Sequence, residues 1–206
     1  MSIIKSINYS WNFFISLENS LEDISRYIEF SERNNQTYSI ELARLFLTAC
    51  SEVDGIAKQL CNILEPERKS ENITCYQKII VSKWVNFPKE KVYIERYGLE
   101  YQPWITWSHS KTPSWWNSYN RVKHKRHLFF EEANLINTIE SLAALLILLF
   151  YYYGIQIVRD EPRAQIDQVM SKLSPNADLM HLESAYYPKS LGFEPGHLLS
   201  EVMGPR

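Results

Sequence analysis

The feature that most constrains the fold is an uncharged, strongly apolar run from Ser141 to Val158 (SLAALLILLFYYYGIQIV). Its length approaches the roughly 20 apolar residues that a membrane-spanning helix needs. A helix that is apolar on every face is also what the centre of a helical bundle requires. Polar residues at helical spacing before the run (Asn134, Asn137 and Glu140) favour the buried helix. We therefore expect a bundle core, and a membrane-associated effector is the alternative.

Apolar residues spaced by three and four predict further helices. The first runs from Trp11 to Ile28. The second begins after a capping serine, Ser39, and ends before Pro66. A weaker third helix is expected from about Asn72 to Trp84. The predicted fold is therefore all-α, a bundle of four or five helices with short and long connections.

The second half of the chain is expected to contain a long loop and two more helices. The stretch from Asn86 to Lys111 has many aromatic residues and no steady period, which indicates a loop with some extended structure. Thr112 and Pro113 supply a capping residue and a first-turn proline for the next helix. The last helix, continuous or kinked with it, is expected from about Phe130 to Tyr153, stopped at Gly154.

Beyond Arg159 the composition changes, since prolines punctuate the sequence and only Ala164 to Leu173 looks helical. We therefore predict a helical bundle over residues 1–158 and an extension over residues 159–206. This extension is interpreted as a peripheral addition or a partner-binding arm. The N-terminus lacks the basic region, long apolar region and cleavage site of a secretory signal, so we expect no export.

Composition excludes several classes of function. The net charge is -2, and none of the six glycines frames a phosphate-binding loop, which argues against a generally basic coat and against P-loop or Rossmann sites. Cys50, Cys61 and Cys75 have neither zinc nor disulfide spacing, so we expect reduced core thiols in a cytoplasmic protein. No metal or cofactor is expected.

The densest chemistry lies in the run WWNSYNRVKHKRH, from Trp115 to His127. Its second half gathers four cations and two histidines: Arg121, Lys123, His124, Lys125, Arg126 and His127. On a helix, Asn120 shares a face with His124, and Lys123 shares a face with His127. Neighbouring cations disfavour a protonated imidazole, which leaves the neutral form that can accept a proton while the cations hold a phosphate. The alternative is a solvated basic turn between two helices.

Asn120, then Lys123 and His124 near the start of a late helix, then a long apolar helix, resemble the HEPN superfamily. These are small helical domains of prokaryotic defence, toxin–antitoxin systems and RNA processing. The resemblance covers Tyr9 to about Ile157, and the tail lies outside it. It implies a HEPN-like helical bundle and a two-fold dimer in which both basic helices line one cleft.

The family signature is an Arg, often followed by Asn or another polar residue, and then a His four to six residues further on. In one registration Asn120 and His124 match it, with Tyr119 at the Arg position. In the other, Arg121 and His127 match it, with Val122 where the polar residue stands. Both registrations remain open at this point.

The resemblance also points to a polar or acidic residue on an earlier helix, for which Glu52 is the candidate. Glu52 borders the apolar face of the second helix, so it either turns inward to orient His124 or pairs as a boundary carboxylate with a nearby cation. Trp116 precedes the basic run and either stacks on a base or packs in the core.

The resemblance thus predicts a metal-independent endoribonuclease of a defence or toxin–antitoxin system. In it His124 is the general base or acid, Arg121 and Arg126 stabilise the phosphate, and Asn120 and Lys123 position it. Further RNA-binding residues are expected at Lys125, His127 and Trp116. The expected partners are RNA, a second copy of the chain, and an antitoxin or other defence protein. The alternative is a non-catalytic interaction or RNA-binding module of a defence complex.

Overall fold

A computed structural model describes residues 8–160, 167–183 and 186, and 69% of these residues are helical. Six α-helices lie in this part of the chain: α1 (Tyr9–Ser25), α2 (Ile40–Leu64), α3 (Ile73–Lys83), α4 (Ser114–Phe129), α5 (Leu135–Asp160) and α6 (Asp167–Lys172). The all-α prediction is confirmed in its coarse form, with one small hairpin added.

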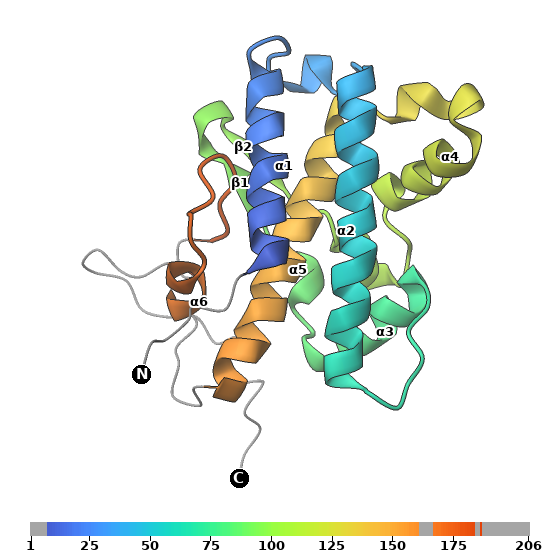
Figure 1. The fold of residues 1–206 in the computed structure, drawn as a ribbon. Helices are drawn as coiled ribbons and strands as arrows, with labels where there is room; N and C mark the ends of the chain where they lie inside the picture. The colour runs from blue at the N-terminus through green and yellow to red at the C-terminus, as the bar shows by residue number, and fades with distance from the viewer. Residues whose placement is uncertain (1–7, 161–166, 184–185, 187–206) are drawn as a thin grey trace.

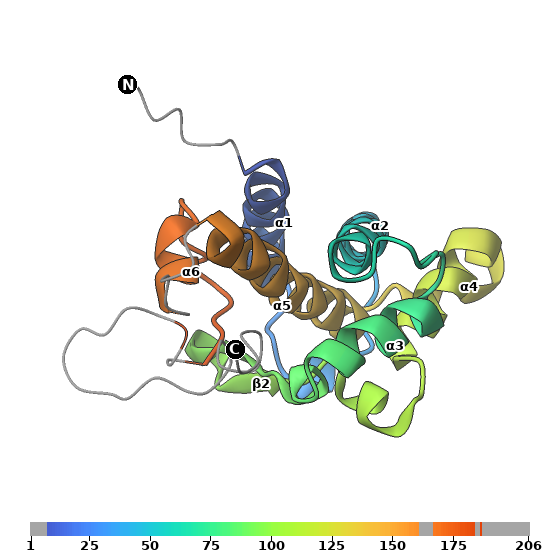
Figure 2. The ribbon, with the colours of Figure 1, turned by 90° about the horizontal axis from the view of Figure 1, so that it is seen from below.

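The apolar helix α5 lies at the centre of the bundle. Every residue from Ser141 to Phe150 is buried. Helices α1 and α2 stand side by side in front of α5, with α3 and α4 beyond α2 and with α6 and the hairpin beyond α1 (Figure 1; Figure 2). By length and composition α5 could cross a bilayer, and 67% of its most apolar window is buried inside the bundle, as in the core helix of a globular protein.

Local sequence signals account for the first three helices. The Ser39 hydroxyl accepts a hydrogen bond from the backbone N–H of Leu42 at 3.1 Å, so the predicted cap of α2 is confirmed. The Asn72 side chain caps α3 in the same way, through the backbone N–H of Cys75 at 3.0 Å. Helix α1 also lies where its apolar spacing predicts, and it ends at Ser25, slightly earlier than expected.

The limits expected for the last helix are wrong at both ends. Phe130 to Glu132 form a separate 3-10 turn, and α5 begins only at Leu135. The cause is Asn134, whose side-chain oxygen accepts the backbone N–H of Asn137 at 3.1 Å and so caps the first turn. At the other end α5 continues through Gly154 to Asp160, because α6 packs against this buried glycine and extends the core.

The stretch expected to be a long loop is more ordered than predicted. It contains 3-10 turns at Phe87–Lys89, Glu95–Tyr97 and Ile105–His109, and an antiparallel hairpin of β1 (Val92–Ile94) and β2 (Leu99–Tyr101). Gly98 adopts a φ of 62° before β2, a left-handed conformation that favours glycine. Three of the six aromatic residues of this stretch are buried in the core, and Trp104 lies 4.2 Å from Trp107 and 5.2 Å from Trp115, centroid to centroid.

The described part of the extension beyond α5, residues 167–183 and 186, packs on the bundle. Glu18 of α1 is buried, and its carboxylate accepts the backbone N–H groups of Asp178, Leu179 and Met180 at 2.8–3.2 Å. The Trp11 indole donates to the Pro175 carbonyl at 2.7 Å. Residues of this segment join the hydrophobic core. The rest of the predicted extension lies outside the described residues.

The three cysteines carry free thiols, and the predicted place in the core is confirmed for two of them. Cys50 and Cys61 are buried, and Cys75 is half-buried. Burial raises the pKa of both Cys50 and Cys61, the latter to about 12, so these thiols are held in the unreactive protonated form.

Candidate functional site

Helix α4 carries the predicted site and stands at the outer edge of the bundle, beside α2 (Figure 1). Its first half is anchored by aromatic side chains. The Trp115 indole donates to the Pro103 carbonyl at 2.9 Å. The Tyr119 ring meets Phe46 of α2 edge to face, with centroids 6.4 Å apart. The second half of α4 therefore projects from a fixed base.

The backbone breaks at Lys125, where φ is -141° and ψ is 47°, so α4 is two helical pieces joined by a kink. Asn120 and His124 both precede the break, and helical spacing places them on one face as predicted. The shared face predicted for Lys123 and His127 is wrong, because the break lies between them and the regular period is lost. The kink turns the last piece of α4 back toward the start of α5.

Arg121 is used to hold this turn. Its guanidinium donates to the Glu132 carboxylate, with Nε–Oε2 at 2.8 Å and a second nitrogen at 2.7 Å. It also lies over the Phe129 ring, 5.7 Å from the centroid, and contacts the Ser118 hydroxyl at 3.4 Å. These contacts join α4 to the 3-10 turn Phe130–Glu132. The charge of Arg121 is thus neutralised within the protein, which weakens its predicted role on a phosphate.

Tyr119 and Lys123 form a second local pair. Tyr119, at the Arg position of the first registration, is only 5% exposed. The Lys123 ammonium donates to the Tyr119 hydroxyl at 3.2 Å and lies 5.1 Å from the ring centroid. One turn earlier, the Asn120 amide donates to the Trp116 carbonyl at 3.1 Å, so its side-chain oxygen remains available as an acceptor.

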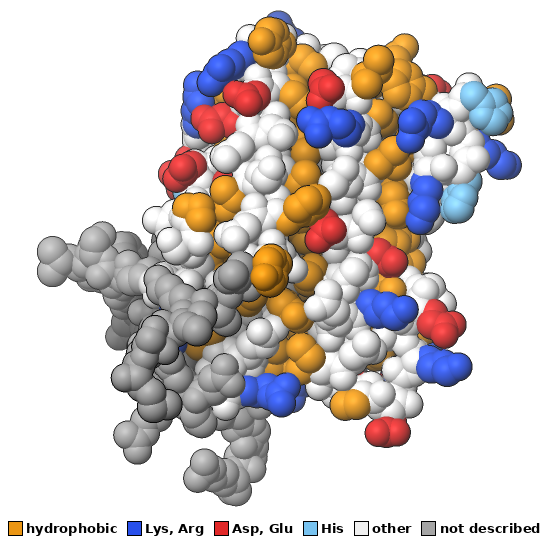
Figure 3. Space-filling view, in the orientation of Figure 1, with side chains coloured by type: hydrophobic (Ala, Val, Ile, Leu, Met, Phe, Trp, Pro, Cys, Tyr) orange, Lys and Arg blue, Asp and Glu red, His pale blue; other side chains and the backbone are white. Residues whose placement is uncertain are grey.

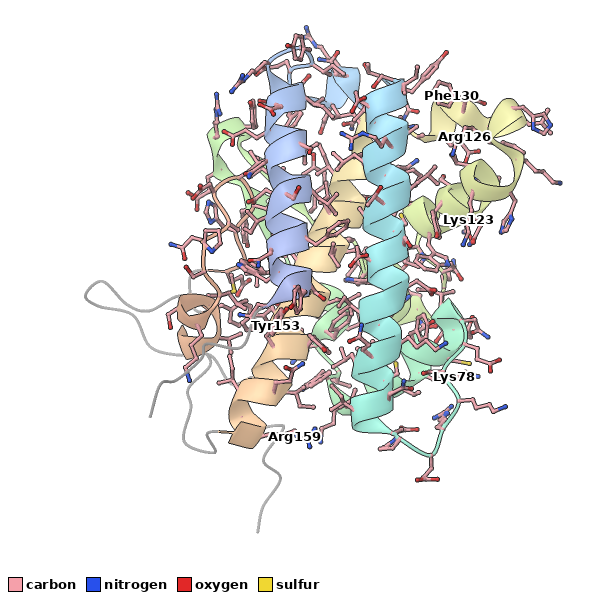
Figure 4. The ribbon with its side chains drawn as sticks, in the orientation of Figure 1. Lys78, Lys123, Arg126, Phe130, Tyr153 and Arg159 are labelled. Carbon is pink, nitrogen blue, oxygen red and sulfur yellow. The ribbon has the colours of Figure 1, made fainter. Side chains whose placement is uncertain are left out.

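The four residues from His124 to His127 are all exposed, and within the part of the chain that the structure describes none of their side chains has a hydrogen bond or an ion pair. Figure 3 shows blue and pale-blue side chains gathered over α4, and Figure 4 labels Lys123 and Arg126 along it. No acidic residue lies in α4 itself. This exposed basic segment, residues 124–127, presents uncompensated positive charge and two imidazoles to solvent.

Glu52 lies on α2 at the border of the core, as predicted, and burial raises the pKa of its carboxyl. Among the residues that the structure describes, it makes neither a hydrogen bond to His124 nor an ion pair with a cation. Neither of the two predicted pairings of Glu52 is therefore formed.

Trp116 does not offer a stacking surface. It is 6% exposed, and its ring packs between Trp115 at 5.7 Å and Tyr119 at 5.2 Å, centroid to centroid. Of the two alternatives for Trp116, the structure shows packing in the core, because neighbouring rings already cover it. Its role is to anchor α4.

Three acidic residues important to the architecture were missed by sequence reasoning. Glu132 is eleven positions from Arg121, which is not a helical spacing, so no periodic signal connects them. Glu18 binds a segment that follows it by more than 150 residues. Glu140 was noted only as a polar flank of the apolar run, and burial raises its pKa to about 7.

Comparison with known proteins gives no relative: no family model, no curated protein and no solved structure matches this chain. The HEPN resemblance therefore depends on the residues of α4 and their helical context alone.

Proposed function

We propose that the chain binds RNA through the exposed basic segment of α4 and cleaves it without a metal ion. The observation that carries the proposal is the set of consecutive cations and histidines, residues 124–127, whose side chains have no ion pair or hydrogen bond among the described residues and which lie on a firmly anchored helix. A phosphate backbone would supply the negatively charged partners for these cations. The resemblance to HEPN ribonucleases, which frames the function in prokaryotic defence or toxin–antitoxin systems, supports the same substrate.

His124 is the proposed general base. It would take the proton of a ribose 2′-hydroxyl, whose oxygen attacks the adjacent phosphorus while the 5′ oxygen leaves and takes up a proton from water. The products are a 2′,3′-cyclic phosphate and a 5′-hydroxyl end. Lys125 and Arg126 would offset the charge that develops on the phosphorane. Asn120, one turn before His124, has a free acceptor oxygen with which to position the ribose.

The second registration receives less support. Arg121 is committed to Glu132, and the kink at Lys125 separates it from His127. We therefore propose that Asn120 and His124 form the site. Arg126 would supply the positive charge that Tyr119, at the Arg position of the first registration, does not carry. A two-fold dimer that brings two basic segments and the unpaired Glu52 carboxyls to one cleft is part of this proposal.

The first test is cleavage of labelled single-stranded RNA and transfer RNA in excess chelator. His124→Ala should lower the rate by roughly 100-fold or more, the usual contribution of a general base. His109→Ala is the matched control, since His109 is exposed in the 3-10 turn Ile105–His109, outside α4, and should leave the rate unchanged. Equal rates for wild type and His124→Ala would contradict the catalytic assignment.

RNA binding is tested separately with the pair Lys125→Ala/Arg126→Ala. Its matched control is Lys78→Ala/Arg159→Ala, which removes the same two charges from exposed positions at the other end of the bundle (Figure 4). Losing two phosphate contacts should reduce the slope of log K against log salt by roughly 1.4 for a single strand. An unchanged slope and affinity would refute the RNA-binding proposal.

A non-catalytic RNA-binding module of a defence complex is the second candidate. It is favoured by the burial of Tyr119 at the Arg position and by the lack of an orienting partner for His124 among the described residues. This candidate predicts that the wild type binds RNA with the same salt slope and yields no cyclic-phosphate ends.

A further inference from the structure

Tyr38 is an exposed aromatic residue just before the start of α2, and it lies beside the basic segment of α4. Tyr38 is 51% exposed, and the residue that opens α2, Ile40, is 77% exposed. Figure 3 shows hydrophobic side chains on this surface between the upper ends of α2 and α4. Single exposed apolar residues are common, but a group of them next to cations that have no ion pair among the described residues indicates an interaction surface.

Tyr38 is held in a fixed place. Its backbone forms an antiparallel bridge with Asn134, and the Thr37 carbonyl accepts the backbone N–H of Leu135 at 2.9 Å. The Tyr38 ring meets the Phe130 ring edge to face, with centroids 5.6 Å apart and planes at 83°. This contact uses one ring's edge, so the pair keeps ring surface that solvent reaches. The ring is therefore preorganised and open.

The Tyr38–Phe130 pair is continuous with the basic segment. Phe130 follows Arg126 by four residues, and both are labelled on the same end of the α4 region in Figure 4. Phe129, between them in sequence, already carries the Arg121 guanidinium over its ring. Alternating cations and aromatic rings are the arrangement that binds single-stranded nucleic acid, since cations hold phosphates and rings stack on unpaired bases.

We infer that Tyr38, supported by Phe130, is a stacking platform for an unpaired base of the RNA whose phosphates lie on Lys125 and Arg126. The substrate is then single-stranded RNA, because the bases of a duplex are covered by their neighbours on both faces. This inference rests on the proposed function and names its substrate class. The positive charge of the basic segment, residues 124–127, favours RNA over an uncharged, apolar occupant.

The test measures the affinity of Tyr38→Ala for a single-stranded RNA and for a duplex of the same length. Single-strand binding should weaken roughly tenfold, or about 1.4 kcal/mol, while duplex binding stays unchanged. Tyr38→Trp should bind as tightly as the wild type or more so. Tyr38→Leu keeps an apolar contact with Phe130 and should still lose the single-strand preference, which separates stacking from packing.

Tyr9→Ala is the matched control, since Tyr9 is 75% exposed at the start of α1, at the opposite end of the bundle from Tyr38 (Figure 1). Equal affinities for Tyr38→Ala and Tyr9→Ala would overturn the inference. So would an equal loss for both RNAs accompanied by a changed oligomeric state, which would make this surface an interface between copies. If Lys125→Ala/Arg126→Ala binds RNA as tightly as the wild type, the proposed function itself fails. If that variant loses RNA binding while Tyr38→Ala keeps the wild-type affinity, only the stacking platform is refuted.

Discussion

The carboxyl of Glu140 should make the protein less stable as the pH rises. Glu140 lies on α5 near the Tyr101 ring, and in the described part of the chain it has no hydrogen bond or ion pair. Burial raises its pKa from 4.5 to about 7, because removing the charged form from water is unfavourable. The perturbation is Glu140→Gln, which keeps the shape and removes the charge.

The size of the effect follows from linkage between protonation and folding. Below pH 4.5 the carboxyl is protonated in both states, and its stabilising contribution is fully present. As the pH rises through 7, the folded protein must take on a partly buried charge and that contribution is lost. The shift from 4.5 to about 7 corresponds to about 3 kcal/mol at most, of which about 2.5 kcal/mol falls between pH 5 and pH 8.5.

Urea unfolding of the wild type and Glu140→Gln at pH 5 and pH 8.5 measures this contribution. Relative to the wild type, the variant should gain roughly 2.5 kcal/mol between the two pH values. Comparing the two proteins at each pH cancels the titration of every other group, and comparing the two pH values cancels the fixed cost of burying an amide. If the free energies of unfolding of the wild type and Glu140→Gln differed by the same amount at both pH values, the raised pKa of Glu140 would be refuted.

Two further predictions concern stability at fixed pH. Glu18→Ala leaves the backbone N–H groups of Leu179 and Met180 buried without acceptors, so the free energy of unfolding should fall by about 3 kcal/mol and amide exchange in residues 167–183 should accelerate. Unchanged exchange in that segment would show that Glu18 does not hold it. Gly154→Ala should raise the free energy of unfolding by about 0.5–1 kcal/mol, because the new Cβ meets only a side chain of α6 at 3.7 Å. Gly55→Ala, at an exposed position of α2, should have the same effect, and thermal unfolding measures both. A loss of stability in Gly154→Ala alone would mean that α6 packs more tightly than described.

Features fixed by neighbouring residues could be predicted from the sequence. The cap at Ser39, the limits of α3 and the buried run of α5 each depend on a short window in which spacing and capping chemistry agree. The burial of Trp116 was one of two open alternatives, because an aromatic residue near a helix start serves a core and a binding surface equally well.

Features that depend on contacts distant in sequence could not be predicted. Gly154 signals a helix end by itself, and only the packing of α6 against it explains why α5 continues. The extension contains no long periodic segment, yet the buried Glu18 carboxylate binds its backbone directly. The kink at Lys125 has no glycine or proline to announce it. Each of these is a tertiary constraint that overrides the local pattern.

The residues of α4 fall into two groups: those that fix the helix to the bundle and those that are exposed to solvent. Trp116, Tyr119 and Arg121 are engaged by neighbouring rings or by Glu132, which fixes the helix against the bundle. The residues that follow, 124–127, are exposed and unpaired within the described structure. A chain stabilised only by its own folding gains nothing from leaving adjacent cations uncompensated, because like charges repel. The rigid base and the exposed cations are the two observations that support the proposed anionic ligand.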